Sequence, residues 1–225
     1  MNERGMIFNA EMVRAILDGR KTQTRRPVKN VRPDNCLTIH PATATRNGTH
    51  THVMDAPKHG LCPFGAVGDR IWVRETFQGP LFDYEQMQSY LEDSSKFEKP
   101  EFCQYAADGK PAPEYYDADD NLHCGWRPSI HMPRWASRIL LEITDVRVER
   151  LHSISERDAL REGLLQLPAS GRYCLQPGMQ YFGMASHSAK EVYSWLWASI
   201  YGEESWDANP WVWVIEYKRV EGGAL

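Results

Sequence analysis

No stretch of the sequence approaches the ~20 consecutive apolar residues of a membrane-spanning helix, although hydrophobic residues fill 42% of its 225 positions. The opening Met1-Asn2-Glu3-Arg4 leads into a foldable segment without the apolar core of a secretory signal. The five cysteines are odd in number and widely spaced, unlike a disulfide framework; they are Cys36, Cys62, Cys103, Cys124 and Cys174. These absences predict a soluble cytoplasmic protein with reduced thiols and no membrane partner.

The sequence also lacks an excess of positive charge. Its formal net charge of -4 argues against a protein that coats nucleic acid non-specifically, because such binding needs a broad cationic surface. A local basic pocket is still compatible with this charge, because the acidic residues gather between Asp83 and Asp120. Arginines that could form such a pocket occur in groups: Arg25 with Arg26, Arg70 with Arg74, and Arg127 with Arg134 and Arg138.

Recognisable cofactor and metal patterns are missing as well. Nothing matches a P-loop or the G-x-G-x-x-G turn of a dinucleotide-binding fold. The neighbouring Cys and His residues at 36 and 40, 50 and 52, and 123 and 124 include no C-x-x-C pair and no second pair at zinc-finger spacing. We expect no cofactor and no metal.

Three segments have the caps and the periodicity of short helices. Asn9 precedes an apolar 3.6-residue pattern over residues 10–18, and a C′ glycine follows it. Ser155 opens a second helix that Gly163 closes. Ser188 forms a capping box for a third, which ends at Gly202. The third helix should bury Val192, Trp195, Leu196 and Ile200.

Strand patterns account for most of the remaining regular sequence. Residues 6–8 and 21–26 favour short strands, and residues 69–77 alternate cleanly between apolar and polar. Residues 138–150 are strongly β, with a change of parity at Thr144-Asp145 that indicates a bulge or a bend. Residues 210–220 begin apolar on both faces, which predicts a central strand.

Two long segments interrupt these elements. Residues 30–65 are rich in Thr, His, Asn and Pro, and residues 78–125 are acidic and tyrosine-rich with a possible helix at 84–92. We interpret both as loop insertions. The predicted strands are too many for the predicted helices to cover on both faces of a sheet, and the bend in the long strand favours closure of the sheet into a barrel. We therefore predict one α+β domain over residues 1–225. Its core would be a small mixed β-barrel with flanking helices.

The segment from Gly19 to Arg25 carries the first candidate site. On an extended chain Lys21 and Arg25 share one face and Thr24 lies on the other, but a tight turn between helix and strand could bring Lys21 and Thr24 into one pocket. Partial burial lowers the pKa of an ammonium group, so such a lysine could accept a proton from a hydroxyl nucleophile. From spacing alone, a solvated basic turn is the favoured interpretation.

The run from Asp18 to Arg26, Asp-Gly-Arg-Lys-Thr-Gln-Thr-Arg-Arg after a short amphipathic helix, resembles the signature of the ASCH domain family of the PUA-like superfamily. Gly68 to Val73 resembles that family's glycine–aspartate turn into its second barrel strand. Residues 139–148, 155–163 and 211–218 resemble its long strand, the following helix and the closing strand, so the resemblance covers roughly half the chain. Trp126 to Trp135 is similar to larger members from phages and prophages.

The resemblance implies a PUA-like β-barrel and an RNA or modified-nucleoside partner, in the cytoplasm of a bacterial host. Small bacterial members act as amidohydrolases on N4-acylated cytidines, and some relatives cleave RNA. The amidohydrolase type uses a Lys, a Thr and a Glu, which match Lys21, Thr24 and, through the helix after the long strand, Glu162. By this resemblance, Thr24 would attack the amide carbonyl with Lys21 as its base. Glu162 would orient Lys21 or return the proton to the leaving amine.

Glu75 is a second candidate, because it lies on the apolar face of its strand pattern. A carboxylate there needs a cationic or hydrogen-bonding partner, and Arg25, Arg26 or Arg138 could supply one. A structural ion pair is slightly favoured over catalysis.

Residues 126–138 interleave aromatic and cationic side chains. Trp126 and Trp135 could stack on bases, and Arg127, His131 and Arg134 could contact phosphate. Equally, the tryptophans could plug the barrel and the arginines could pair with the acidic insertion.

The sequence therefore leaves three functions open. The first is an enzyme that hydrolyses a modified nucleoside or, less favoured, RNA. The second is a non-catalytic reader of RNA or modified bases that uses the same pocket and its arginines at 25, 26, 70 and 74. The third is a phage morphogenesis or host-interaction protein whose insertions are the working surface. Resemblance of fold alone does not choose among them.

Overall fold

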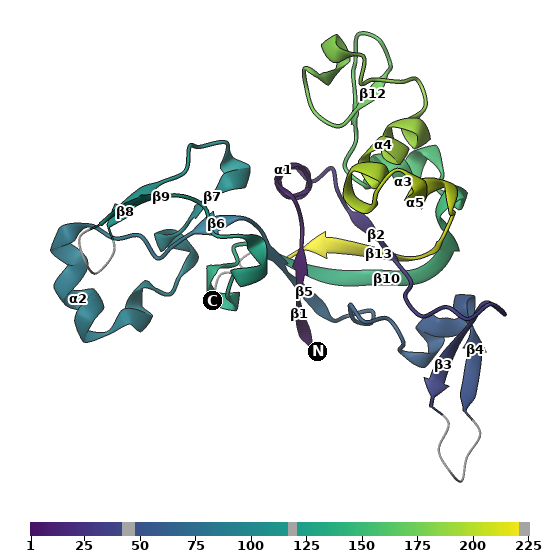
Figure 1. Ribbon diagram of the computed structural model, residues 1–225, viewed down its shortest axis with the longest axis horizontal. Helices are drawn as coiled ribbons and strands as arrows, with labels where there is room; N and C mark the ends of the chain where they lie inside the picture. The colour runs from purple at the N-terminus through teal and green to yellow at the C-terminus, as the bar shows by residue number, and fades with distance from the viewer. Residues whose placement is uncertain (42–47, 117–120, 221–225) are drawn as a thin grey trace. The chain divides into compact units, whose positions relative to one another are not determined.

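A computed structural model describes residues 1–41, 48–116 and 121–220 of the chain. The fold is mixed α+β, as predicted, and its main sheet has five strands in the order β1-β5-β10-β13-β2 (Figure 1). These strands are β1 (Glu3–Ile7), β5 (Arg70–Arg74), β10 (Leu140–Arg150), β13 (Trp211–Arg219) and β2 (Gln23–Pro27). β1 runs parallel to β5, whereas β10 is antiparallel to β5 and β13 is antiparallel to β2.

The described residues form no closed barrel, so the predicted PUA-like barrel is not confirmed. β1 and β2 are the two ends of the strand order. The parity change in residues 138–150 predicted a bend that favours closure, but β10 runs on as one strand of 11 residues. A change of hydrophobic parity reports which face is buried and does not by itself bring two distant edges together.

The chain forms two compact units, which we describe separately. The first unit contains residues 1–14, 70–142 and the end of the chain from 219, and the second contains residues 15–69 and 143–218.

All three predicted helices are present, with the caps that the sequence indicated. α1 (Ala10–Leu17) follows Asn9, whose side chain accepts a hydrogen bond from the Met12 amide at 2.9 Å. α3 (Glu156–Arg161) and α4 (Ala189–Tyr201) follow Ser155 and Ser188, whose hydroxyls accept bonds from amides three residues on. Each cap satisfies a donor that the first helical turn leaves free.

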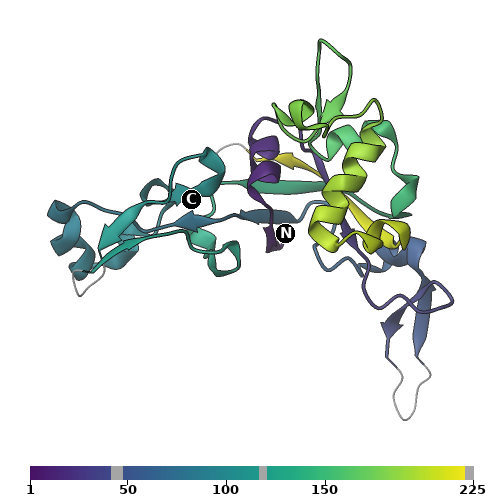
Figure 2. The same ribbon diagram turned by 45° about the horizontal axis from the view of Figure 1, so that its top comes forward.

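The buried face of α4 is partly different from the predicted one. Val192 and Leu196 are buried as expected, but Trp195 is only half-buried and Ile200 is exposed, so these two predictions are wrong. Tyr193 and Trp197 are buried instead, so the buried stripe of α4 is rotated about the helix axis from the predicted one. α3, α4 and the short α5 (Glu204–Asp207) lie together beside β13 and β2 (Figures 1 and 2).

β13 is a central strand, as its sequence predicted, between β10 and β2. Four consecutive side chains, Val212 to Ile215, are buried. Burial on both faces explains why the first half of this strand is apolar without alternation.

The two insertions are not simple loops, and the interpretation of residues 30–65 as an insertion of loops is wrong. That segment contains the hairpin of β3 (Cys36–His40) and β4 (Thr49–His52), followed by a 3-10 helix, Val53–His59. Within 78–125 the predicted helix is present as a 3-10 turn, Tyr84–Gln86, that continues into α2 (Met87–Glu92). Isolated two-stranded hairpins have short strands. Such strands show too little hydrophobic alternation to be recognised in the sequence.

The second insertion also contains two small antiparallel pairs, β6 (Phe77–Gln78) with β7 (Gln104–Tyr105) and β8 (Glu114–Tyr116) with β9 (Leu122–Cys124). A further pair, β11 (Leu165–Gln166) with β12 (Tyr173–Cys174), follows α3. The remaining short 3-10 helices are Ser94–Phe97, Pro100–Phe102, Ala106–Asp108, Ser129–His131, Arg134–Ala136, Leu151–Ser153 and Met179–Phe182. Within the described ranges, no helix has the length and apolarity needed to cross a membrane.

Candidate functional site

Lys21 and Glu162 form a buried ion pair in the second unit. The Lys21 Nζ lies 2.7 Å from Glu162 Oε2 and donates a second bond to the Glu162 carbonyl oxygen at 3.0 Å. Both residues are 2% exposed. The contact joins the turn after α1 to the end of α3, two segments that are far apart in the sequence.

Local backbone geometry holds this pair in place. The chain reverses after α1 at Gly19, whose φ of 72° is in the left-handed region, and the Lys21 amide then donates to the Ala15 carbonyl at 2.9 Å. On the other side Gly163 has a φ of 107°, and a Cβ there would lie 2.8 Å from Ala15 Cβ and 3.2 Å from Lys21 Cβ. Only glycine therefore allows the two segments to approach this closely.

Arg25 joins the pair from β2 and is itself fully buried. Its guanidinium lies 3.2 Å from Glu162 Oε1, 3.2 Å from Glu149 and 3.5 Å from Asp158. We call these five residues the Lys21 cluster. Two cations and three carboxylates share it, and the carboxylates of Glu149 and Asp158 are partly exposed at its edge.

Burial lowers the pKa of the Lys21 amine, because the ammonium form loses its hydration. The Glu162 carboxylate opposes this effect, and the nearby Arg26 and Arg25 add to it. Burial likewise raises the pKa of Tyr193 and Tyr217, and the charge of Glu162 raises both further. The arrangement places an amine with a lowered pKa against a carboxylate, out of solvent.

Thr24 is buried, but strand geometry separates it from the Lys21 cluster. β2 pairs regularly with β13, with Gln23 opposite Glu216, Thr24 opposite Ile215 and Arg25 opposite Val214. In a regular strand successive side chains leave opposite faces. Arg25 faces α3, so Thr24 leaves the other face.

A wider charge network, which sequence reasoning missed, continues from the cluster. Arg147 lies 2.6 Å from Glu149 and 2.5 Å from Glu216, and Arg161 holds Glu216 through two bonds of 3.0 and 2.9 Å. Alternating charges at 145, 147 and 149 on β10 were the available signal. Their parity puts them on one face, where the charges of α3 can meet them.

The remaining arginines of the predicted pocket have other surroundings. Arg26, next to Arg25 on β2, is half-buried, and its charge acts on Lys21. Arg70 and Arg74 lie on β5 in the first unit. Arg74 donates to the carbonyls of Ser129 and Ile130 and lies over the Trp72 ring at 5.3 Å.

Glu75 is buried in the first unit, and its partner is Arg138, one of the three that the sequence allowed. The guanidinium makes two bonds of 3.0 Å to Glu75, two more to Asp108, and lies 3.9 Å above the Tyr105 ring. Burial raises the pKa of Glu75, and Arg138 opposes the rise. A doubly bonded guanidinium on a packed ring fits the structural interpretation of this pair.

Residues 126–138 form an ordered segment of the first unit. Trp135 packs against the buried cluster of Phe77, Tyr105, Met132 and Ala136, and Trp126 is half-buried. Arg134 lies 2.9 Å from Glu3, whereas Arg127 and His131 are exposed. Without a closed barrel in the described residues, the tryptophans have no barrel to plug, and Trp135 completes the core of the first unit instead.

The described residues include no group of three or more His, Cys, Asp or Glu side chains placed to hold a metal ion. No protein-family model, curated protein or solved structure matches the chain. The assignment of function therefore depends on the geometry above.

Proposed function

We propose that the second unit handles a modified nucleoside at the Lys21 cluster, and that its reaction is hydrolysis of an N4-acylated cytidine, with an ASCH-type, PUA-like origin. The supporting observation is the 2.7 Å contact between Lys21 and Glu162. The resemblance assigned these two residues to one catalytic set although 141 positions separate them.

The proposed reaction requires Lys21 to act as a proton acceptor. A neutral amine takes the proton of the attacking hydroxyl as the new C–O bond forms, and it then returns that proton to the departing exocyclic amine. A pKa lowered by burial raises the neutral fraction at a given pH. The Lys21 amine donates to one carboxylate oxygen of Glu162, and the Arg25 guanidinium donates to the other oxygen.

Two nucleophiles fit this scheme. Thr24 is the one that the resemblance implies, through an acyl-enzyme ester that water then hydrolyses. A water molecule held by Lys21 is the other, and the opposite facing of Thr24 on β2 favours it. In either case the fully buried Lys21 side chain reaches substrate only after the residues that cover it move.

The test is the release of cytidine from N4-acetylcytidine by the full chain. Lys21→Met should abolish turnover, and the double variant Lys21→Met/Glu162→Gln should stay inactive while regaining stability. Lys58→Met, at an exposed lysine in the same unit, should keep full activity. Absence of turnover of N4-acetylcytidine by the parent protein would overturn the proposed hydrolytic function.

The second candidate is non-catalytic recognition of RNA or a modified base at the same site. The supporting observation is that Glu162 already accepts hydrogen bonds from both Lys21 and Arg25. A fully bonded carboxylate of this kind makes the site rigid, which favours recognition over proton transfer. Salt-sensitive binding of an RNA that contains N4-acetylcytidine, without product formation, would support it.

A further inference from the structure

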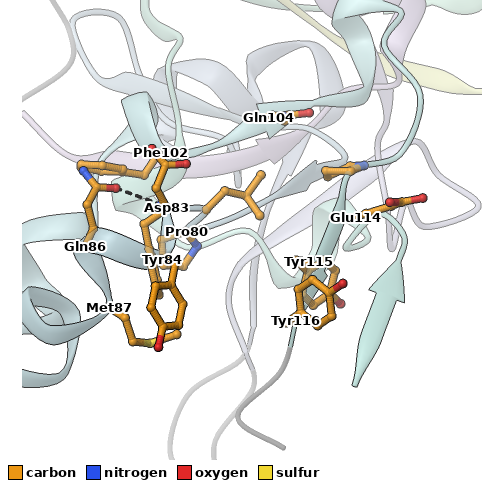
Figure 3. Close-up of a pocket in the computed structure, with 13 residues that line it drawn as sticks. Pro80, Asp83, Tyr84, Gln86, Met87, Phe102, Gln104, Glu114, Tyr115 and Tyr116 are labelled. Atoms are coloured by element: carbon orange, nitrogen blue, oxygen red, sulfur yellow. Dashed lines mark hydrogen bonds between the residues drawn. The ribbon is translucent and has the colours of Figure 1, made fainter. Parts of the chain in front are cut away.

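A separate feature is an open groove in the first unit, with a volume of about 840 Å³. Residues between 80 and 116 line it, so it contains none of the residues that the sequence assigned to a site. Figure 3 shows Tyr84 and Met87 on one side and Tyr115 and Tyr116 on the other.

The walls of the groove rest on packed aromatic rings. Phe82 stacks on Tyr90 at 4.4 Å between ring centroids and contacts Phe97, which is buried, at 5.2 Å. Phe102 packs on the same ring at 4.8 Å. The groove is therefore built before a ligand arrives, which lowers the entropic cost of binding.

Its rim presents apolar surface to solvent. Tyr84 is 90% exposed, Tyr116 is 68% exposed, and Met87, on the same side as Tyr84, is 41% exposed. Single exposed apolar residues are ordinary, but several around one concavity mark an interaction site. Because the rim rings stay uncovered, the groove is open and suits an extended chain better than an enclosed small molecule.

The charge of the groove selects the kind of chain. Asp83 and Glu114 are the charged lining residues, and the whole segment 78–125 contains no arginine. Phosphate groups would be repelled here. Tyrosine faces attract ammonium and guanidinium groups, and aromatic grooves bind proline rings of a polyproline II segment.

We propose that this groove binds an extended, proline-containing peptide segment of a partner protein that carries lysine or arginine. The tyrosines would hold proline rings and cationic side chains, and the two carboxylates would select the positive charge. This interaction is independent of the Lys21 cluster, which belongs to the other unit.

The experiment measures binding of fluorescein-labelled peptides to the full chain by fluorescence anisotropy. The test peptide contains two Pro-x-x-Pro units flanked by arginines, and matched peptides replace the arginines by glutamate or the prolines by alanine. A single-stranded oligonucleotide serves as the competing ligand class. We expect binding of the test peptide only, weakened by salt.

Variants then locate the site. Tyr84→Ala and Tyr116→Ala should each weaken binding about two- to fivefold, as expected when one exposed cation–π contact is lost. Glu114→Lys should weaken it further, because it reverses a charge. Tyr181→Ala is the matched control, since Tyr181 is 83% exposed and lies in the second unit. It should bind normally.

Any of three results in the binding comparisons would overturn the proposal, as would a fourth named below. They are equal binding of the arginine and glutamate peptides, loss of binding in Tyr181→Ala to the same extent as in Tyr84→Ala, and preferential binding of the oligonucleotide. Failure to bind any peptide would also overturn it. None of these results bears on nucleoside hydrolysis, so the two proposals fail separately.

Discussion

Replacing Lys21 by methionine should destabilise the protein far more than the same replacement of Lys58. Methionine preserves most of the length of the side chain but removes its charge, and it leaves the Glu162 carboxylate buried. Breaking a buried ion pair from one side costs about 3–5 kcal/mol. Arg25 remains 3.2 Å from Glu162 and still partly neutralises the buried carboxylate. We therefore expect a loss of unfolding free energy at the lower end of this range, about 3 kcal/mol.

The double variant Lys21→Met/Glu162→Gln separates charge from packing. With the carboxylate neutralised, no unpaired negative charge stays buried, and Arg25 still pairs with Glu149 and Asp158. Neutral replacements of buried pairs are often tolerated. We therefore expect the double variant to regain at least about half of the lost free energy of unfolding.

These differences in the free energy of unfolding can be measured by urea unfolding, followed by the fluorescence of the eight tryptophans. The comparison requires that the dependence of this free energy on urea concentration is the same in all variants. Lys58 pairs with Asp55 at 2.7 Å but on the open surface, so Lys58→Met should change nothing measurable. A loss in Lys21→Met no larger than that in Lys58→Met would refute the reasoning. A double variant less stable than the single one would refute the assignment of the cost to the unpaired carboxylate.

Three further outcomes follow from the structure. Gly163→Ala should cost about 2–3 kcal/mol of unfolding free energy, because its Cβ meets a neighbouring Cβ at 2.8 Å and its φ is positive. Burial raises the pKa of Cys103 from 9.0 to about 11. At pH 8 its thiolate fraction should therefore be about a hundredfold below that of an ordinary thiol, and peptide mapping after iodoacetamide treatment should show the exposed Cys124 alkylated first. Arg138→Met should cost about 3 kcal/mol by leaving Glu75 buried and unpaired, as measured by urea unfolding.

Matched controls accompany these variants. Gly183 also has a positive φ, of 77°, but a Cβ there meets nothing within 4 Å, so Gly183→Ala should carry only the backbone cost of about 1–2 kcal/mol. Arg134→Met breaks a half-exposed pair with Glu3 and should cost under ~1 kcal/mol. Alkylation of Cys103 should accelerate as the pH rises toward 11, and a rate at pH 8 equal to that of Cys124 would contradict the shift.

Helix ends could be predicted because their signals are local. Asn9, Ser155 and Ser188 each accept a hydrogen bond from an amide three residues further on, so a window of four residues contains both partners. β13 could be predicted for a similar reason, since its run of buried side chains is contiguous. In both cases the cause and the effect share one segment.

Features set by tertiary contacts were the ones that sequence reasoning missed. Glu149 on β10 and Asp158 on α3 both contact Arg25 on β2 through their side chains, and nothing in the local pattern around Arg25 indicates this. α4 buries Trp197 and leaves Trp195 only half-buried, a choice that the neighbouring packing decides. The paired strands of the insertions are only two to five residues long, and their pairing depends on the partner strand.

The segment from Lys21 to Arg25 brings these two kinds of evidence into direct conflict. Its parity put Lys21 with Arg25 and opposite Thr24, whereas the resemblance implied that Lys21 and Thr24 share one pocket. In the structure Lys21 and Arg25 both hold Glu162, and residue-by-residue pairing of β2 with β13 keeps Thr24 on the other face. Alternation is a consequence of pleating and cannot be undone inside a regular strand. Direct proton transfer from Thr24 to Lys21 would therefore require the segment from Lys21 to Arg25 to change conformation. Retained turnover in Thr24→Val, together with its loss in Lys21→Met, would assign the attack to water, whereas loss in both, with Thr24→Val still folded, would assign the attack to Thr24.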